Sequence, residues 1–304
     1  MTPHSARVMV EMRKILVPVD FFPASLTAVK QAIELAIRYS ARLTLLHVIE
    51  PIAPWVDGVP FNAREIIETT TTKSTAELNK VAALSHAADV RTEVLVRNGP
   101  VDTVIESAVR TEGVDFVVMG THGRRAIGKF FLGSTTERLL RNLPVPLLAI
   151  RHAKPTPQRY RHILVTTDFS EGTSSAIEYA WSLATKYGAD MTLLHVLDDV
   201  QADVIGSYRG PLLRGIQYDL ESLLPVDGGK KCKVQVLIGS PIRRILSMAE
   251  QVPADLIVMN IHTKTVMDRL SIGSTAEKII RAANVPVLAV PSVSVRTKKA
   301  KPAR

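Results

Sequence analysis

Residues 117–141 read VVMGTHGRRAIGKFFLGSTTERLLR, and this stretch indicates a strand, a glycine-rich loop and a helix in succession. The apolar run 116–119 has the length of a buried strand in a parallel sheet. Gly133 and Ser134 open the helix, and Glu137 lies three residues after the serine, so Ser134 is expected to cap the first turn. A glycine loop that ends at a helix N-terminus brings free backbone N–H groups together and predicts a phosphate site. The structural alternative is a plain turn in which the glycines only allow a tight bend.

The glycine loop matches neither of two common phosphate motifs. The segment GRRAIGK approaches the Walker A pattern, but a phenylalanine follows it where that loop needs a hydroxyl for magnesium. No G-x-G-x-x-G follows a strand, so the dinucleotide fingerprint is missing as well. The pattern that does occur is Gly120-x2-Gly123-x9-Gly133-Ser134. It resembles the ATP-binding signature of the universal stress protein family.

The sequence contains two copies of one module. ILVPVDF at 15–21 recurs as ILVTTDF 148 residues later, and from residue 114 onward the offset between the copies is 140. The repeat predicts a first domain at 12–151, a linker with two prolines at 152–158, a second domain at 159–292 and a basic tail at 293–304.

Apolar strand patterns alternate with helical patterns in each module, which predicts an α/β fold with a parallel sheet and helices on both faces. In the first module we expect strands near 14–19, 43–49, 92–97, 115–119 and 146–150, with helices near 24–39, 62–86, 101–112 and 134–142. The last strand of each module is apolar and should be a sheet edge, so we expect edge pairing between modules or between chains. The glycines and proline at 206–215 predict an irregular segment in the second module.

The resemblance to universal stress proteins covers about residues 12–151 and 159–292 and identifies a tandem two-domain member. It implies two doubly wound, Rossmann-like, five-stranded parallel sheets with strand order 3-2-1-4-5. The two modules are expected to pair within one chain, in place of the dimer that single-module relatives form, and a homodimer of the whole chain is left open.

Asp20 and Asp168 end the first strand of their modules, where a carboxylate can accept hydrogen bonds from ribose hydroxyl groups. Capping of the following helix is the alternative role. The family implies that the main chain of Val48 contacts adenine. His47, beside it, is interpreted as a structural histidine, and His122 in the loop either contacts phosphate or points to water.

The candidate sites of the two modules differ in the glycine loop. The predicted nucleotide-binding residues of the first module are Pro18, Val19, Asp20, Val48, Met119, Gly120, His122, Gly123, Arg124, Gly133, Ser134 and Thr135. The weaker candidates of the second module are Asp168, Val196, Gly273, Ser274 and Thr275. Asn260 and Thr263 replace the two leading glycines there, and their side chains should crowd a phosphate. We therefore expect weak or no nucleotide binding by the second module.

The composition of the chain argues against membrane, secreted and nucleic-acid-binding proteins. The chain has 304 residues, 46% of them hydrophobic, and lacks an apolar run of the roughly 18 residues that a spanning helix needs. Its single cysteine, Cys232, and the absence of a signal-peptide pattern predict a cytoplasmic protein. Five of the +9 net charges lie in the tail, which has no aromatic residues for base stacking, so no specific nucleic-acid partner is expected.

The sequence predicts an ATP-binding stress or regulatory protein whose nucleotide, with Mg²⁺, alters domain packing or partner choice. No zinc-ligand cluster and no nucleophile motif occurs, so we assign no catalytic residue and no protein metal site, and expect at most slow ATP hydrolysis. Two alternatives stay open. One is an ATP-dependent phosphotransferase or adenylyl-transferring enzyme, and the other is a nucleotide-free interaction module.

Overall fold

The computed structural model describes residues 10–50, 55–56, 59–60, 63–121, 132–151, 159–199, 208–225, 232–261 and 274–292. The chain divides into two compact units, one formed mainly by residues 12–143 and the other mainly by residues 159–292. We call them the first and the second module.

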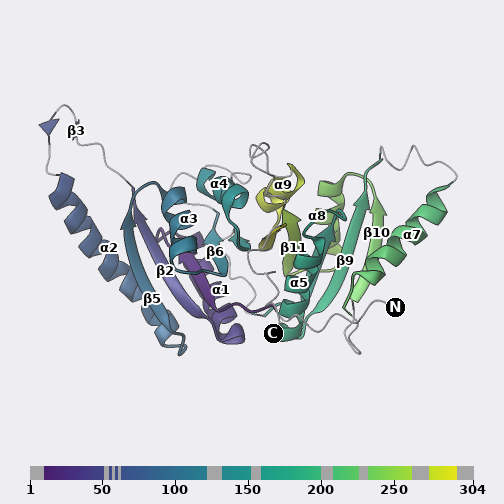
Figure 1. Cartoon of the computed structure of the whole chain (residues 1–304), viewed down its shortest axis with the longest axis horizontal. Helices are drawn as coiled ribbons and strands as arrows, with labels where there is room; N and C mark the ends of the chain where they lie inside the picture. The colour runs from purple at the N-terminus through teal and green to yellow at the C-terminus, as the bar shows by residue number, and fades with distance from the viewer. Residues whose placement is uncertain are drawn as a thin grey trace, which may run out of the picture. The chain divides into compact units, whose positions relative to one another are not determined.

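The first module is a five-stranded parallel sheet with helices on both faces (Figure 1). Its elements are β1 (Lys14–Pro18), α1 (Pro23–Tyr39), β2 (Arg42–Ile49), α2 (Ala63–His86), β5 (Thr92–Asn98), α3 (Val101–Thr111), β6 (Phe116–Gly120), α4 (Ser134–Asn142) and β7 (Leu147–Ile150), with a short antiparallel pair, β3 (Trp55–Val56) and β4 (Val59–Pro60), before α2. The strand order β5-β2-β1-β6-β7 is 3-2-1-4-5 when the five parallel strands are counted along the chain. The predicted α/β class is confirmed.

Burial on both faces explains why β1, β6 and β7 are continuous apolar runs rather than alternating ones, whereas the outer strand β5 has no buried residue. Helices α1 and α2 cover one face of the sheet, and α3 and α4 cover the other. The central residues of β1, Ile15, Leu16 and Val17, are fully buried between the two helix layers. This core holds the two ends of the parallel strands in place. We call these ends the amino edge, where the strands begin, and the carboxyl edge, where they end, and polar groups are accessible at both.

The second module repeats this architecture. Its elements are β8 (His162–Thr167), α5 (Thr173–Tyr187), β9 (Asp190–Leu197), α7 (Arg209–Ser222), β10 (Cys232–Ile238), α8 (Pro241–Gln251), β11 (Leu256–Ile261), α9 (Ser274–Ala282) and β12 (Val287–Pro291). The strands are parallel in the order β10-β9-β8-β11-β12. Pairing through the outer strands of the modules stays a prediction.

The irregular segment predicted at 206–215 is wrong from residue 209 onward, because α7 is a continuous helix of 14 residues. Gly210 and Pro211 fall in its first turn, where the missing N–H of proline removes no intrahelical bond. Gly215 lies in the interior, which a helix tolerates at about 1 kcal/mol relative to alanine. Gly206 lies outside the described residues.

An aspartate holds the start of the first strand in both modules, and it is buried in the first and half-buried in the second. Asp115 Oδ2 accepts hydrogen bonds from the backbone N of Arg13 at 2.8 Å and of Lys14 at 3.0 Å. Asp255 makes the same pair of bonds at the start of β8. Within the described ranges, no helix combines the length and the apolar character that crossing a membrane requires.

Candidate functional site

The predicted site residues on the strands of the first module gather at the carboxyl edge of the sheet. They are Pro18, Val19 and Asp20 at the end of β1, Val48 near the end of β2, and Met119 and Gly120 at the end of β6. Because β1 lies between β2 and β6, all six surround the point where the strand order reverses, which is where ligands bind in doubly wound sheets.

The N-terminus of α4 is joined to this edge. The backbone N of Gly133 donates to the carbonyl of Thr121 at 3.2 Å, directly after β6. Gly133, not Ser134, is the N-cap residue, and no side chain caps the helix, so the predicted serine cap is wrong. Ser134 and Thr135 lie in the first turn, whose N–H groups have no intrahelical acceptor. His122, Gly123 and Arg124 lie outside the described residues.

Helix packing already explains the glycine at position 120. A Cβ atom there would lie 2.7 Å from the carbonyl carbon of Ala24 and 2.7 Å from the backbone N of Ser25, both in the first turn of α1. Such distances are far below van der Waals contact between carbon atoms. A Cβ at Gly133 would meet the carbonyl oxygen of Thr121 at 3.2 Å, a milder conflict. Gly120 therefore has a structural reason that is independent of any ligand, whereas a side chain at Gly133 would need only a small shift of its neighbour.

Asp20 keeps one carboxylate oxygen available. Its Oδ1 accepts a hydrogen bond from the backbone N of Phe22 at 3.0 Å, which closes a turn ahead of α1. The N-cap residue of α1 is Phe22, which makes no side-chain cap, so Asp20 is not the cap residue. The side chain is exposed, and Oδ2 has no hydrogen-bond partner within the described part of the chain. The carboxylate can thus accept bonds from a ligand without breaking its turn.

A strained phenylalanine follows this aspartate in both modules. Phe21 and Phe169 have φ values of 65° and 61°, which L side chains rarely adopt. Their rings lie 4.7 and 4.8 Å from those of His47 and His195. His47 Nδ1 lies 2.7 Å from the carbonyl oxygen of Val19, an atom that only accepts, so Nδ1 carries a proton. This hydrogen bond agrees with the interpretation of His47 as a structural histidine.

In the second module the position of Gly120 is taken by Asn260, and its amide fills the space beside the aspartate. Asn260 Nδ2 donates to Ser170 Oγ at 2.7 Å and to Asp168 Oδ1 at 3.3 Å. The backbone N of Ser170 donates to the same carboxylate oxygen at 3.1 Å, and its hydroxyl group donates there too. Asp168 is therefore engaged by its neighbours in a way that Asp20 is not.

The helix that follows the aspartate begins later in the second module than in the first. Helix α5 begins at Thr173, the counterpart of Ser25, whereas α1 begins two residues earlier in the aligned modules, at Pro23. Gly172 precedes α5 with a φ of 96°. The other second-module candidates, Val196 near the end of β9 and Thr275 in the first turn of α9, lie at the corresponding edge. Gly273 and the side chain of Ser274 lie outside the described residues.

Sequence reasoning missed the phenylalanine conformation and the role of Ser170. The phenylalanine conformation had a signal in the sequence, because the Asp-Phe pair and the histidine after it occur in both modules. For the role of Ser170, the signal was a paired difference between the modules, since Phe22 and Gly120 are exchanged together for Ser170 and Asn260. Within the described ranges, no group of three or more His, Cys, Asp or Glu side chains could hold a metal ion.

Comparison with known proteins extends over both modules. A family model described as the universal stress protein family matches residues 11–151 and 159–291. A universal stress protein of Mycolicibacterium smegmatis is 27% identical over 296 residues, covering 91% of this chain and 96% of its own. One from Methanocaldococcus jannaschii is 30% identical over 145 residues, covering 43% of this chain and 82% of its own. A crystal structure of a universal stress protein from Archaeoglobus fulgidus has a TM-score of 0.73 at 25% identity, covering 92% of this chain and 98% of its own.

Proposed function

Because the chain belongs to the universal stress protein family, we propose that its first module binds ATP at the carboxyl edge of its sheet. The nucleotide is the signal in a stress or regulatory role in the cytoplasm, where it alters the packing of the two modules or the choice of partner. We assign no catalytic residue, and hydrolysis is at most slow.

The contrast between Asp20 and Asp168 carries this proposal. Both follow the first strand of a module, at the point where the strand order reverses. Both carboxylates are exposed, and Oδ1 of each accepts a bond from the backbone N two residues further on, but Oδ1 of Asp168 also accepts bonds from the Ser170 hydroxyl group and the Asn260 amide. In the first module Gly120 leaves the place beside the carboxylate without a side chain, whereas in the second the Asn260 amide occupies it and competes with a ligand for Oδ1.

Each part of the site suits a part of the nucleotide. The Asp20 carboxylate would accept hydrogen bonds from the ribose hydroxyl groups, and the main chain of Val48 would face the base. The free N–H groups at Ser134 and Thr135, with the positive end of the helix dipole, would receive phosphate oxygens. Bound Mg²⁺ would neutralise phosphate charge, and it would arrive with the nucleotide, since the protein residues at this edge that the structure describes form no metal cluster.

Calorimetric titration of the full chain with MgATP tests the proposal. The unmodified chain should bind one nucleotide. Asp20→Asn should weaken binding about tenfold, because an amide oxygen preserves the turn to Phe22 but loses a charge-assisted hydrogen bond of about 1.4 kcal/mol. The matched control is Asp168→Asn, which should leave the affinity unchanged. The proposal fails if the unmodified chain does not bind, or if Asp168→Asn weakens binding and Asp20→Asn does not.

A further inference from the structure

We propose that the first module has a second ligand site at the amino edge of its sheet. This site binds a small, doubly charged phosphate compound. A cavity of about 280 Å³ lies there, lined by Lys14, Arg42, Leu43, Arg91, Thr92 and Glu93. These residues begin β1, β2 and β5, whereas the proposed ATP site lies where the same strands end. The two sites are therefore separated by the length of the strands, and this inference does not rest on ATP binding.

Strand pairing places three cations in a row at this edge. Lys14 of β1 lies opposite Arg42 of β2 in the register. The backbone N of Leu43 donates to the carbonyl of Arg91 at 2.9 Å, which sets Arg91 beside the start of β2. Neighbouring strands lie about 4.8 Å apart, so the three backbones span roughly 10 Å.

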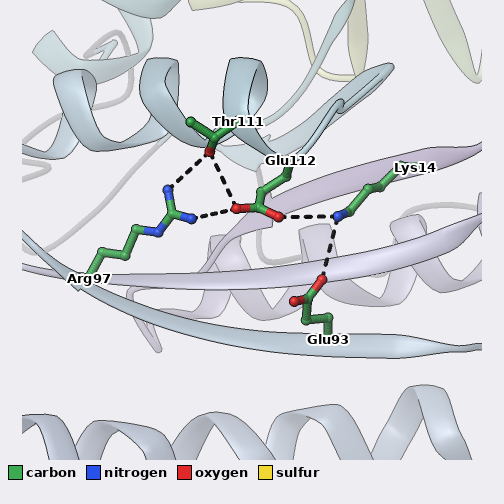
Figure 2. Close-up of polar contacts among 5 residues, drawn as sticks. All are labelled: Lys14, Glu93, Arg97, Thr111 and Glu112. Atoms are coloured by element: carbon green, nitrogen blue, oxygen red, sulfur yellow. Dashed lines mark hydrogen bonds and ion pairs between the residues drawn. The ribbon is translucent and has the colours of Figure 1, made fainter.

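The lysine in this row is already neutralised by a polar network (Figure 2). Lys14 Nζ lies 3.4 Å from Glu93 Oε2 and 3.5 Å from Glu112 Oε2. Arg97 Nη2 lies 2.5 Å from the other oxygen of Glu112, and the hydroxyl group of Thr111 bridges this second pair. Two cations and two carboxylates balance one another, so the network adds no net charge to the cavity.

Arg42 and Arg91 are left with two unneutralised charges at the cavity. Both are exposed, and within the described part of the chain neither makes an ion pair or a side-chain hydrogen bond. A guanidinium group presents paired donors that match phosphate oxygens, so two such groups suit a doubly charged phosphate compound. A water molecule occupies about 30 Å³ in the liquid, so the cavity has room for more than one phosphate group.

The second module shows that the fold does not need these arginines. The counterpart of Arg42 is Asp190, at the start of β9, and the counterpart of Lys14 is His162. The counterpart of Arg91, Lys231, lies outside the described residues. Because the same strand edge forms with an acidic residue in the central position, strand pairing alone does not account for the arginine pair.

Pyrophosphate is the probe, titrated calorimetrically into the full chain at low salt. The double variant Arg42→Gln, Arg91→Gln should bind at least about tenfold more weakly than the unmodified chain, the loss of roughly one strong charged contact. Arg42→Lys, Arg91→Lys should fall between them, because lysine keeps the charge but not the paired donors. The matched control is Lys30→Gln, Lys73→Gln, which removes the same charge from exposed positions of α1 and α2 and should change the affinity less than about twofold.

Two outcomes would overturn the proposal. One is an unmodified chain that takes up no pyrophosphate. The other is an affinity that the arginine variants do not lower, which places any binding elsewhere, including at the α4 N-terminus. Melting curves of all variants show whether a loss of binding follows from unfolding. A lower melting temperature of the Gln double variant with unchanged binding would mean that the arginines only offset the negative C-terminal ends of α1 and α2.

Discussion

Replacing Gly120 with alanine should destabilise the first module. The added Cβ would lie 2.7 Å from two backbone atoms of α1 and 3.0 Å from the Cβ of Ala24. Carbon atoms normally approach to about 3.5–4.0 Å, so α1 has to move by roughly 1 Å. Overpacking of this kind costs about 1–3 kcal/mol. We expect the upper part of that range, because backbone atoms of a packed helix cannot rotate away as a flexible side chain can.

Scanning calorimetry of the full chain would measure the effect. A loss of about 3 kcal/mol in a domain of this size lowers the midpoint of its transition by roughly 6–12 °C. Gly215→Ala is the control of opposite sign: no atom lies within 4 Å of its added Cβ, and alanine in the interior of α7 should add about 0.5–1 kcal/mol to the second module. If Gly120→Ala melts at the same temperature as the unmodified chain, the close approach of α1 does not explain the glycine, and ligand approach becomes its main reason.

Three further outcomes follow from buried or paired polar groups. Thr44 Oγ1 is fully buried without a hydrogen-bond partner among the described residues, so Thr44→Val should raise the free energy of urea unfolding by about 1 kcal/mol. The control, Thr192→Val, should lower this free energy, because it removes the 2.9 Å hydrogen bond between Thr192 and His162. Destabilisation by Thr44→Val would refute this account. The hydrogen bond from Arg97, helped by Lys14, lowers the pKa of Glu112 below its usual 4.5. A pKa that is lower in the folded than in the unfolded state stabilises the fold above the unfolded-state pKa, and this stability is lost as the pH falls through the folded-state pKa. The free energy of unfolding should therefore fall more steeply with pH below 4.5 in the unmodified chain than in Glu112→Gln. Equal slopes would contradict the pairing of Glu112 with Arg97. Burial raises the pKa of the Cys232 thiol to about 11, so the folded chain should react slowly with iodoacetamide at mildly alkaline pH and rapidly in urea; rapid labelling of the folded chain would show an accessible thiolate.

Local patterns predicted most of the fold because each element is set by its own residues. The run of apolar residues in β1 and the helical period of α3 are visible without any contact partner, and the repeat then implies that both modules share one topology. The errors are also local. Gly210 and Pro211 resemble helix breakers until the first residue of α7 is known, and then they occupy a turn that tolerates them. Ser134 resembles a cap because the pattern does not show that the extended residue is Gly133.

The site was less predictable because its geometry depends on contacts between distant segments. The motif marks Gly120 as a place for ligand approach, but the atoms that exclude a side chain there belong to Ala24 and Ser25, nearly a hundred residues away in the sequence. Similarly, Arg42 and Arg91 become neighbours only through the pairing of β2 with β5. Spacing along the chain carries no signal for such pairs.

The asparagine at position 260, where the first module has a glycine, has a consequence for engineering the second module. Its amide donates to Ser170, and α5 starts two residues later than α1 in the aligned modules. Asn260→Gly alone would leave the Ser170 hydroxyl group without that donor, and it would not by itself extend α5 by the two residues. Converting this edge of the second module to the arrangement of the first therefore needs changes at several positions together, and position 260 is only one of them.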